Sequence, residues 1–270
     1  MGHESLPDAT WTSTSGPSRR PRARLFGWIA AAAVAGVLAT LPYEQSITLS
    51  AESVLLPWPA LLVASLVHLA LVLLCASIGM RLGPTLGLGA PDLIAWVERQ
   101  PHAGSKLGRA IRRGLLWGAA AGIVTTMLGA AAEAILPLPE ELHAASWSPW
   151  HGLLGAFGAG INEELIFRLG VMTLFARLLS LLVRRLPPPP ALIWTANALA
   201  ALGFGFAHLP ILEVLTEVNH LTVGLVLAGN GLVGLLFGWL YWRSGLVAAM
   251  AAHFATDLVL KALVPLLLPL

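Results

Sequence analysis

Seven long apolar runs constrain the fold of this chain more than any other feature. They cover residues 25–41, 54–80, 114–136, 150–186, 191–212, 221–242 and 246–268. At a rise of about 1.5 Å per residue, each can cross roughly 30 Å of hydrocarbon. We therefore expect an all-α, polytopic membrane protein, a bundle of about seven (seven or eight) transmembrane helices. The fourth run is too long for one straight span, and we expect it to break or to extend beyond the membrane.

The composition supports a membrane protein and excludes several other classes. Charged residues make up only 11% of the 270, hydrophobic residues 57%, and the mean hydropathy is +0.77. Soluble domains average about 25% charged residues. A soluble globular enzyme, a disordered chain and a coiled coil are therefore excluded. The expected partner of these apolar surfaces is the lipid bilayer.

The basic residues and the single cysteine remove further possibilities. The net charge is +2, but the Lys and Arg residues lie in gaps between apolar runs rather than on one basic face. This distribution predicts no nucleic-acid partner, and the lack of a phosphate-binding loop motif predicts no nucleotide. Cys75 lies alone inside an apolar run, so we expect neither a disulfide framework nor a cysteine-based zinc site.

The distribution of basic residues also predicts the orientation. Fourteen of the 16 Lys and Arg residues fall before the first run, in alternate connections between the runs, or at the end of the fourth run, whereas the other connections carry Glu residues and no Lys or Arg. Cytoplasmic loops are enriched in Lys and Arg. We therefore expect a multi-pass protein of the cell (plasma) membrane with a cytoplasmic N-terminus. Residues 1–24 are polar and basic and are expected to form a disordered tail, and residues 25–149 to form N-terminal transmembrane helices.

Three ionisable residues interrupt the fourth run. Glu163, Glu164 and Arg168 lie within six positions, and each charge costs about 2.5–3.5 kcal/mol at mid-bilayer. Glu164 and Arg168 are four residues apart and can form a structural ion pair on one helix face. Glu163 points about 100° away from Glu164, so it lies outside this ion pair and is free to take part in catalysis. The alternative is an ion-pair network that only holds helices together.

The fifth and seventh runs supply imidazoles and a further acid. His208 follows a glycine-rich stretch of the fifth run, and the seventh run contains His253 and Asp257. Because they are four residues apart, His253 and Asp257 form an oriented pair, two metal ligands or a structural hydrogen bond. Two carboxylates and two imidazoles on three spans are the ingredients of water activation inside a membrane.

The expected depths of these residues disagree. Counted from the outer boundary at 1.5 Å per residue, Glu163 lies roughly 20 Å deep, whereas His208 lies only about 8 Å below Glu213. Either the fifth helix tilts or extends past Glu213, or its outer boundary is misplaced.

The three groups together resemble the ordered motifs of a known family. Glu163-Glu164-x-x-x-Arg168, Phe204-x-x-x-His208 and His253-x-x-x-Asp257 look like those of the CAAX protease and bacteriocin-processing family, which includes the type II CAAX prenyl endopeptidases. The resemblance covers roughly residues 150–260. It implies that residues 150–270 form a catalytic membrane domain and that the protein is an intramembrane endopeptidase.

The resemblance also implies roles for the site residues. Glu163 and His208 would activate the attacking water, and His253 and Asp257 would stabilise the oxyanion or hold a metal. In the metal version one divalent ion, assumed to be zinc, would be bound by Glu163, His208, His253 and Asp257. A metal-free mechanism is also open. This chain has Asp257 where prenyl endopeptidases usually have Asn, and an ionised Asp cannot donate a hydrogen bond to an oxyanion.

Two other classes of function compete with this interpretation. One is a non-catalytic membrane scaffold or bacteriocin-immunity-type protein that keeps the fold. The other is a small-solute transporter, which the lack of an internal repeat disfavours. A complete set of catalytic residues favours the endopeptidase, whose substrate would be a membrane-associated peptide or protein.

Overall fold

The computed structural model describes residues 19–50, 58–135, 148–210 and 218–267. Within these ranges the chain is helical and contains no strand. The longer helices are α1 (Arg19–Ser50), α2 (Trp58–Leu82), α4 (Ala103–Ile135), α6 (Pro149–Glu164), α7 (Thr173–Val183), α8 (Pro190–Ala207), α10 (His220–Ser244) and α11 (Leu246–Leu258). The shorter segments are η1 (Gly83–Leu86), α3 (Pro91–Val97), η2 (Leu165–Met172), η3 (Val259–Leu263) and α12 (Val264–Leu267).

Seven helical stretches in the described part of the chain are long and apolar enough to cross a membrane. They match the seven apolar runs in order, so the predicted all-α, polytopic membrane bundle is confirmed. The first helix begins earlier than expected, because residues 19–24, assigned above to the tail, already belong to α1. Residues 1–18 lie outside the described residues.

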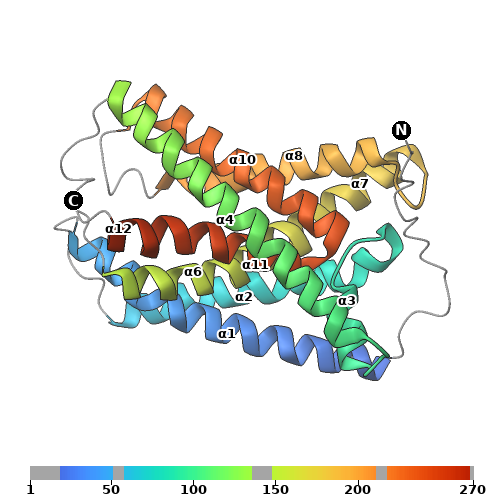
Figure 1. The fold of residues 1–270 in the computed structure, drawn as a ribbon. Helices are drawn as coiled ribbons and strands as arrows, with labels where there is room; N and C mark the ends of the chain where they lie inside the picture. Colours follow the sequence, from blue (N-terminus) through green and yellow to red (C-terminus); the bar gives the residue numbers. More distant parts are fainter. Residues whose placement is uncertain (1–18, 51–57, 136–147, 211–217, 268–270) are drawn as a thin grey trace.

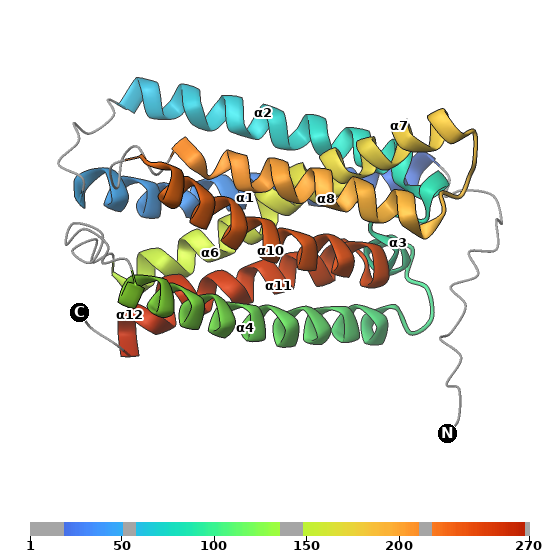
Figure 2. The same ribbon diagram turned by 90° about the horizontal axis from the view of Figure 1, so that it is seen from above.

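Helices α6 and α11 occupy the centre of the bundle. Their spans have the largest buried fraction of the seven. Figure 1 shows α6 and α11 running side by side above α1, with α4 crossing over α11. Figure 2 shows α2 and α4 on opposite edges, with the other long helices between them. In both views α3 and the turn from α7 to α8 lie at one end of the bundle, called the α3 end below, and α12 lies at the other.

Glycines allow α4 to pack closely against the central helix α11. A Cβ atom added at Gly118 would collide with the backbone of Ala252, and one at Gly122 would lie 2.9 Å from the carbonyl oxygen of Thr256. Thr256 Oγ1 donates a hydrogen bond of 3.0 Å to the carbonyl oxygen of Gly118. Small residues four positions apart, such as Gly118 and Gly122, allow transmembrane helices to approach closely in this way. This close packing fixes the position of α11, which carries two of the candidate site residues.

The fourth apolar run neither breaks nor leaves the bundle. It continues from α6 through the π-helical segment η2 into α7, over residues Pro149–Val183. The π-helical turns begin directly after Glu164 and include Arg168. π-helical insertions within α-helices often occur at functional sites, because the extra residue per turn redirects side chains.

The structure places His208 beside Glu163, although the sequence predicts different depths for the two residues. Helix α8 ends at Ala207, and His208 is the residue that caps its C-terminus. Leu209 and Pro210 are helical again, and the predicted outer boundary near residue 212 and Glu213 both lie outside the described residues. His208 belongs to the end of a short helix, where it reaches the level of Glu163.

Candidate active site

Glu163 lies between the two imidazoles that the sequence singled out. Its Oε2 atom is 3.8 Å from His208 Nε2 and 3.8 Å from His253 Nε2. The three residues come from α6, from the end of α8 and from α11. Oε2 is buried and forms no hydrogen bond with any described residue. The site therefore directs one carboxylate oxygen and two ring nitrogens toward a common point, at separations that a small reactant can bridge.

The remaining nitrogen of each imidazole is fixed by an acceptor. His208 Nδ1 lies 2.8 Å from the carbonyl oxygen of Phe204, and His253 Nδ1 lies 2.8 Å from Glu164 Oε1. A carbonyl and a carboxylate oxygen can only accept, so Nδ1 carries the proton in both rings. The Nε2 atoms are therefore the ones available for chemistry beside Glu163.

Glu164 and Arg168 form the ion pair expected from their spacing. Arg168 Nη1 donates to Glu164 Oε1 at 2.9 Å, and the two side chains are 1% and 0% exposed. The same Oε1 accepts the hydrogen bond from His253 described above. Glu164 therefore couples the ion pair to the orientation of a site imidazole. The sequence predicts the ion pair but not the contact with His253, which is 89 residues away.

Arg168 has further partners on neighbouring helices. Its Nη2 atom donates to the carbonyl oxygen of Gly234 on α10 at 2.9 Å. Its guanidinium carbon lies 4.7 Å from the ring centroid of Phe204 and 5.3 Å from that of Phe237. Charge, hydrogen bonds and aromatic faces thus satisfy this buried cation from three helices.

Phe204 and Phe237 form an aromatic wall beside the imidazoles. Phe237 stacks on His253 with centroids 4.8 Å apart and planes 19° apart. Phe204 packs against His208 with centroids 4.6 Å apart. Both phenyl rings are almost fully buried. They limit the rotation of both imidazoles and exclude water from that side of the site. Phe237 carries no signal in the sequence, because an aromatic residue in an apolar run is most often part of the core.

Asp257 has a different main partner from the one expected. Its Oδ2 atom lies 2.5 Å from Lys261 Nζ but 3.7 Å from His253 Nε2. Lys261 also lies over the ring of Tyr43, 5.1 Å from its centroid. The group that orients His253 is therefore Glu164 rather than Asp257. Asp257 instead forms an ion pair with Lys261, which the sequence analysis missed.

The four expected metal ligands do not form a ready-made metal site. Within the described residues, no group of three or more His, Cys, Asp or Glu side chains is placed to hold a metal ion. Asp257 fits the role poorly, because an ammonium group occupies its inward-facing oxygen. Glu163, His208 and His253 do have the donor types of a two-histidine, one-glutamate zinc site.

The comparisons with known proteins agree with the motif resemblance. Residues 145–259 match the model of a family described as type II CAAX prenyl endopeptidase Rce1-like. The matched region contains all six predicted site residues but neither Lys261 nor helix α4. Neither curated proteins nor solved structures give a match to this chain.

Proposed function

We propose that this chain, whose residues 145–259 match the Rce1-like family model, is an intramembrane endopeptidase. It hydrolyses a peptide bond in a membrane-associated peptide or protein. The observation that carries the proposal is the position of Glu163 Oε2, buried and 3.8 Å from the Nε2 atoms of both His208 and His253. Glu164 Oε2 also lacks a hydrogen-bond partner among the described residues, so what distinguishes Glu163 is that its Oε2 lies equally close to two imidazole nitrogens that come from different helices.

Glu163 acts as the general base in the proposed mechanism. It removes a proton from a water molecule as the water oxygen attacks the carbonyl carbon of the substrate. The resulting oxyanion is stabilised by an adjacent imidazole that carries a proton on both ring nitrogens, so that its Nε2–H group donates to the oxyanion while its Nδ1–H group keeps its acceptor. Glu163 then returns the proton to the leaving amine, the C–N bond breaks, and a new carboxyl terminus and a new amino terminus result. Glu164 supports this step by accepting from His253 Nδ1 and so holding its Nε2 toward the reaction centre.

A divalent metal remains a prediction for this site. If one takes part, we expect Glu163, His208 and His253 to hold it and Asp257 to stay paired with Lys261. The ion would then polarise the substrate carbonyl and its bound water. Metal content measured by mass spectrometry on the purified protein tests this expectation independently of activity. His208→Ala should lower the content, whereas Asp257→Asn should not.

The substrate is expected to approach from the His208 side. Glu163 and His208 are 26% and 30% exposed, whereas His253 is only 4% exposed and lies behind Phe237. A peptide bond near the membrane can reach Glu163 by this route. The family description favours a substrate whose C-terminus carries a prenylated cysteine.

Product analysis with purified protein tests the proposed activity. Matched membrane-anchored peptides, with and without a prenyl group, are incubated with the wild type and with Glu163→Gln. Mass spectrometry should find one cleavage site with the wild type and a rate about 10²–10⁴-fold lower with the variant, because the base is lost. Preferential cleavage of the prenylated peptide supports specificity for prenylated substrates. Equal cleavage of both peptides supports endopeptidase activity without that specificity. Absence of cleavage by folded wild-type protein contradicts the proposal.

We further propose that the α3 end faces the cytoplasm and that the protein resides in the plasma membrane. The exposed residues Ser105 and Ser148 lie near the starts of α4 and α6, at opposite ends of the bundle. In a Cys75→Ala background, a membrane-impermeant thiol reagent applied to intact cells should label Ser148→Cys and spare Ser105→Cys. The opposite pattern would reverse the orientation.

A further inference from the structure

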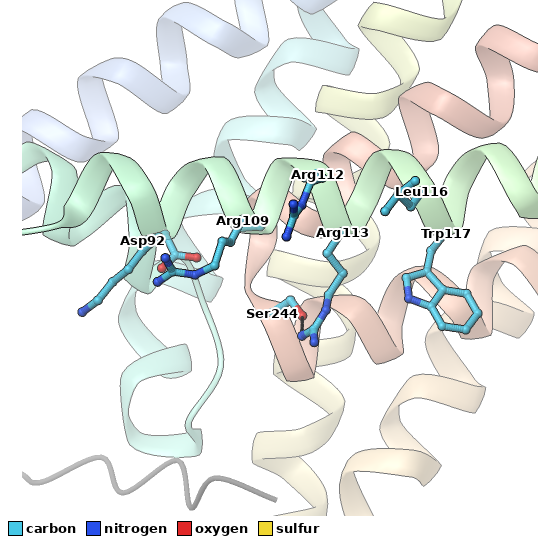
Figure 3. Close-up of a pocket in the computed structure, with 9 residues that line it drawn as sticks. Asp92, Arg109, Arg112, Arg113, Leu116, Trp117 and Ser244 are labelled. Atoms are coloured by element: carbon cyan, nitrogen blue, oxygen red, sulfur yellow. Dashed lines mark hydrogen bonds between the residues drawn. The ribbon is translucent and has the colours of Figure 1, made fainter.

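A basic pocket opens at the α3 end of the bundle, and all of its lining residues except Ser244 lie outside the region that matches the family. It is a cavity of about 610 Å³ between α3, α4 and the end of α10. Figure 3 shows the basic side chains of α4 around it, with Asp92 on one side and Trp117 on the other. The lining residues are Asp92, Lys106, Arg109, Ala110, Arg112, Arg113, Leu116, Trp117 and Ser244.

The pocket has an unbalanced positive charge. Four cationic side chains (Lys106, Arg109, Arg112 and Arg113) face one carboxylate, Asp92, which leaves an excess of three positive charges. Arg113 Nη1 donates to Ser244 Oγ at 2.8 Å. Within the described residues, the other three cations form neither a hydrogen bond nor a close ion pair. Their charge is therefore available to a ligand, and the ligand must be an anion.

Asp92 cannot neutralise this group of cations. Burial raises the pKa of Asp92, while the nearby Lys106 and Arg109 oppose that effect. Even when Asp92 is fully ionised, it compensates only one of the four positive charges. Arginine guanidinium groups donate in pairs to phosphate oxygens, which makes a phosphate group the anion that suits this lining best.

The apolar part of the lining indicates the source of the phosphate. Leu116 and Trp117 continue α4 toward the middle of the membrane-spanning stretch and are 67% and 47% exposed. Trp117 packs edge-to-face against Trp239 of α10, with centroids 5.5 Å apart. A tryptophan below a basic cluster is typical of the membrane interface. A phospholipid matches both the basic and the apolar part of the lining, because its headgroup can contact the cations while its acyl chain covers Leu116. A soluble phosphate or an acidic peptide would leave the apolar side uncovered.

We propose that this pocket binds the headgroup of an anionic phospholipid, with the phosphate held by Arg109, Arg112 and Arg113 and an acyl chain along Leu116 and Trp117. Basic pockets between transmembrane helices bind anionic headgroups in this way. The site is separate from the candidate active site and does not depend on the proposed peptidase activity. It is nevertheless built on α4, which packs through Gly118 against the helix that carries His253.

Lipid binding to the full-length protein tests the proposal. The protein is placed in phosphatidylcholine nanodiscs containing increasing amounts of phosphatidylglycerol, and bound phosphatidylglycerol is counted by native mass spectrometry. We expect the wild type to prefer phosphatidylglycerol at least tenfold. The triple variant Arg109→Gln, Arg112→Gln, Arg113→Gln should lose at least tenfold in affinity, because each surface cation attracts an anionic lipid.

A matched triple variant controls for general loss of charge. Arg177→Gln, Arg184→Gln, Arg185→Gln removes the same charge at the same end of the bundle, from α7 and the turn after it. This protein should keep the wild-type affinity within threefold. An equal loss in both triple variants, or no lipid preference in the wild type, would overturn the proposal.

A separate variant distinguishes a lipid from a soluble anion. Leu116→Ser removes part of the apolar contact without touching a cation. It should weaken phosphatidylglycerol binding several-fold and leave the binding of inorganic phosphate unchanged. If inorganic phosphate or an acidic peptide displaces phosphatidylglycerol completely and Leu116→Ser has no effect, the pocket serves a soluble ligand and the lipid assignment is wrong.

Discussion

The buried site and the basic pocket use the same kinds of charged residue in opposite ways. Arg168 is 1% exposed and is held by Glu164, by a carbonyl oxygen of α10 and by two phenyl rings. Arg109 and Arg112 are exposed and form no close ion pair among the described residues. A cation deep in the bundle needs hydrogen bonds and an opposite charge from the protein itself, whereas a cation at the end of the bundle can obtain them from a ligand.

The largest expected effect comes from removing the buried cation. Arg168→Met should destabilise the protein by about 3–5 kcal/mol, because Glu164 is left charged and fully buried. Arg112→Met should change stability by less than about 0.5 kcal/mol, since its side chain lies at the surface. Thermal unfolding in detergent, with the folded yield from size-exclusion chromatography, measures both variants. Similar losses in the two proteins would remove the distinction between the two regions.

A smaller effect is expected at the ion pair that the sequence analysis missed. Lys261→Met strands the carboxylate of Asp257 and should cost about 2–3 kcal/mol. Adding Asp257→Asn should recover most of that loss, because the uncompensated charge is then gone. A double-mutant cycle on thermal stability tests the coupling. Additive effects of the two substitutions would mean that the pair is not coupled in the folded protein.

The smallest predicted effect concerns the link between the two regions. Gly118→Ala places a methyl group against the backbone of Ala252 and should destabilise the protein by about 1–3 kcal/mol. Gly129→Ala, on the same helix, meets nothing within 4 Å and should be neutral or slightly stabilising. The two unfolding temperatures give the comparison. Equal unfolding temperatures would show that α4 and α11 do not pack as closely as described.

The transmembrane helices were predictable from the sequence, but the places where they depart from a continuous α-helix were not. Apolar runs predict spans because only their length and composition matter. The π-helical turns after Glu164 and the early end of α8 before His208 depend on packing between helices. Counting residues from a predicted boundary therefore does not give the position of His208, which the structure places 3.8 Å from Glu163.

Part of the candidate site was predictable because its partners lie one helical turn apart. The pairing of Glu164 with Arg168 follows from a spacing of four residues, and the same spacing could have revealed Asp257 with Lys261. Lys261 and Arg168 are also the two basic residues that lie outside the loops. The contact between Glu164 and His253 joins residues far apart in sequence, and no local pattern reports it.

The sequence also contains a pattern that indicates the basic pocket. Lys106 precedes Arg109 by three residues, and Arg112 and Arg113 follow Arg109 by three and four, so these side chains lie near one another on α4. Counted only as positive charges of one loop, these residues predict the orientation of the protein in the membrane and nothing else. Their helical spacing, together with the apolar residues that follow, indicates a surface that can hold an anion at the membrane boundary.

One measurement tests the central claim, that Glu163 activates water within the bundle. Wild type, Glu163→Gln and Glu164→Gln are assayed in water enriched in ¹⁸O, and the mass of the new carboxyl terminus is measured alongside folded yield. We expect one ¹⁸O atom in the new carboxyl terminus of the wild-type product. We also expect a rate about 10²–10⁴-fold slower for Glu163→Gln at unchanged yield, and losses of both rate and yield for Glu164→Gln. A folded Glu163→Gln protein that cleaves within threefold of the wild-type rate would contradict this claim.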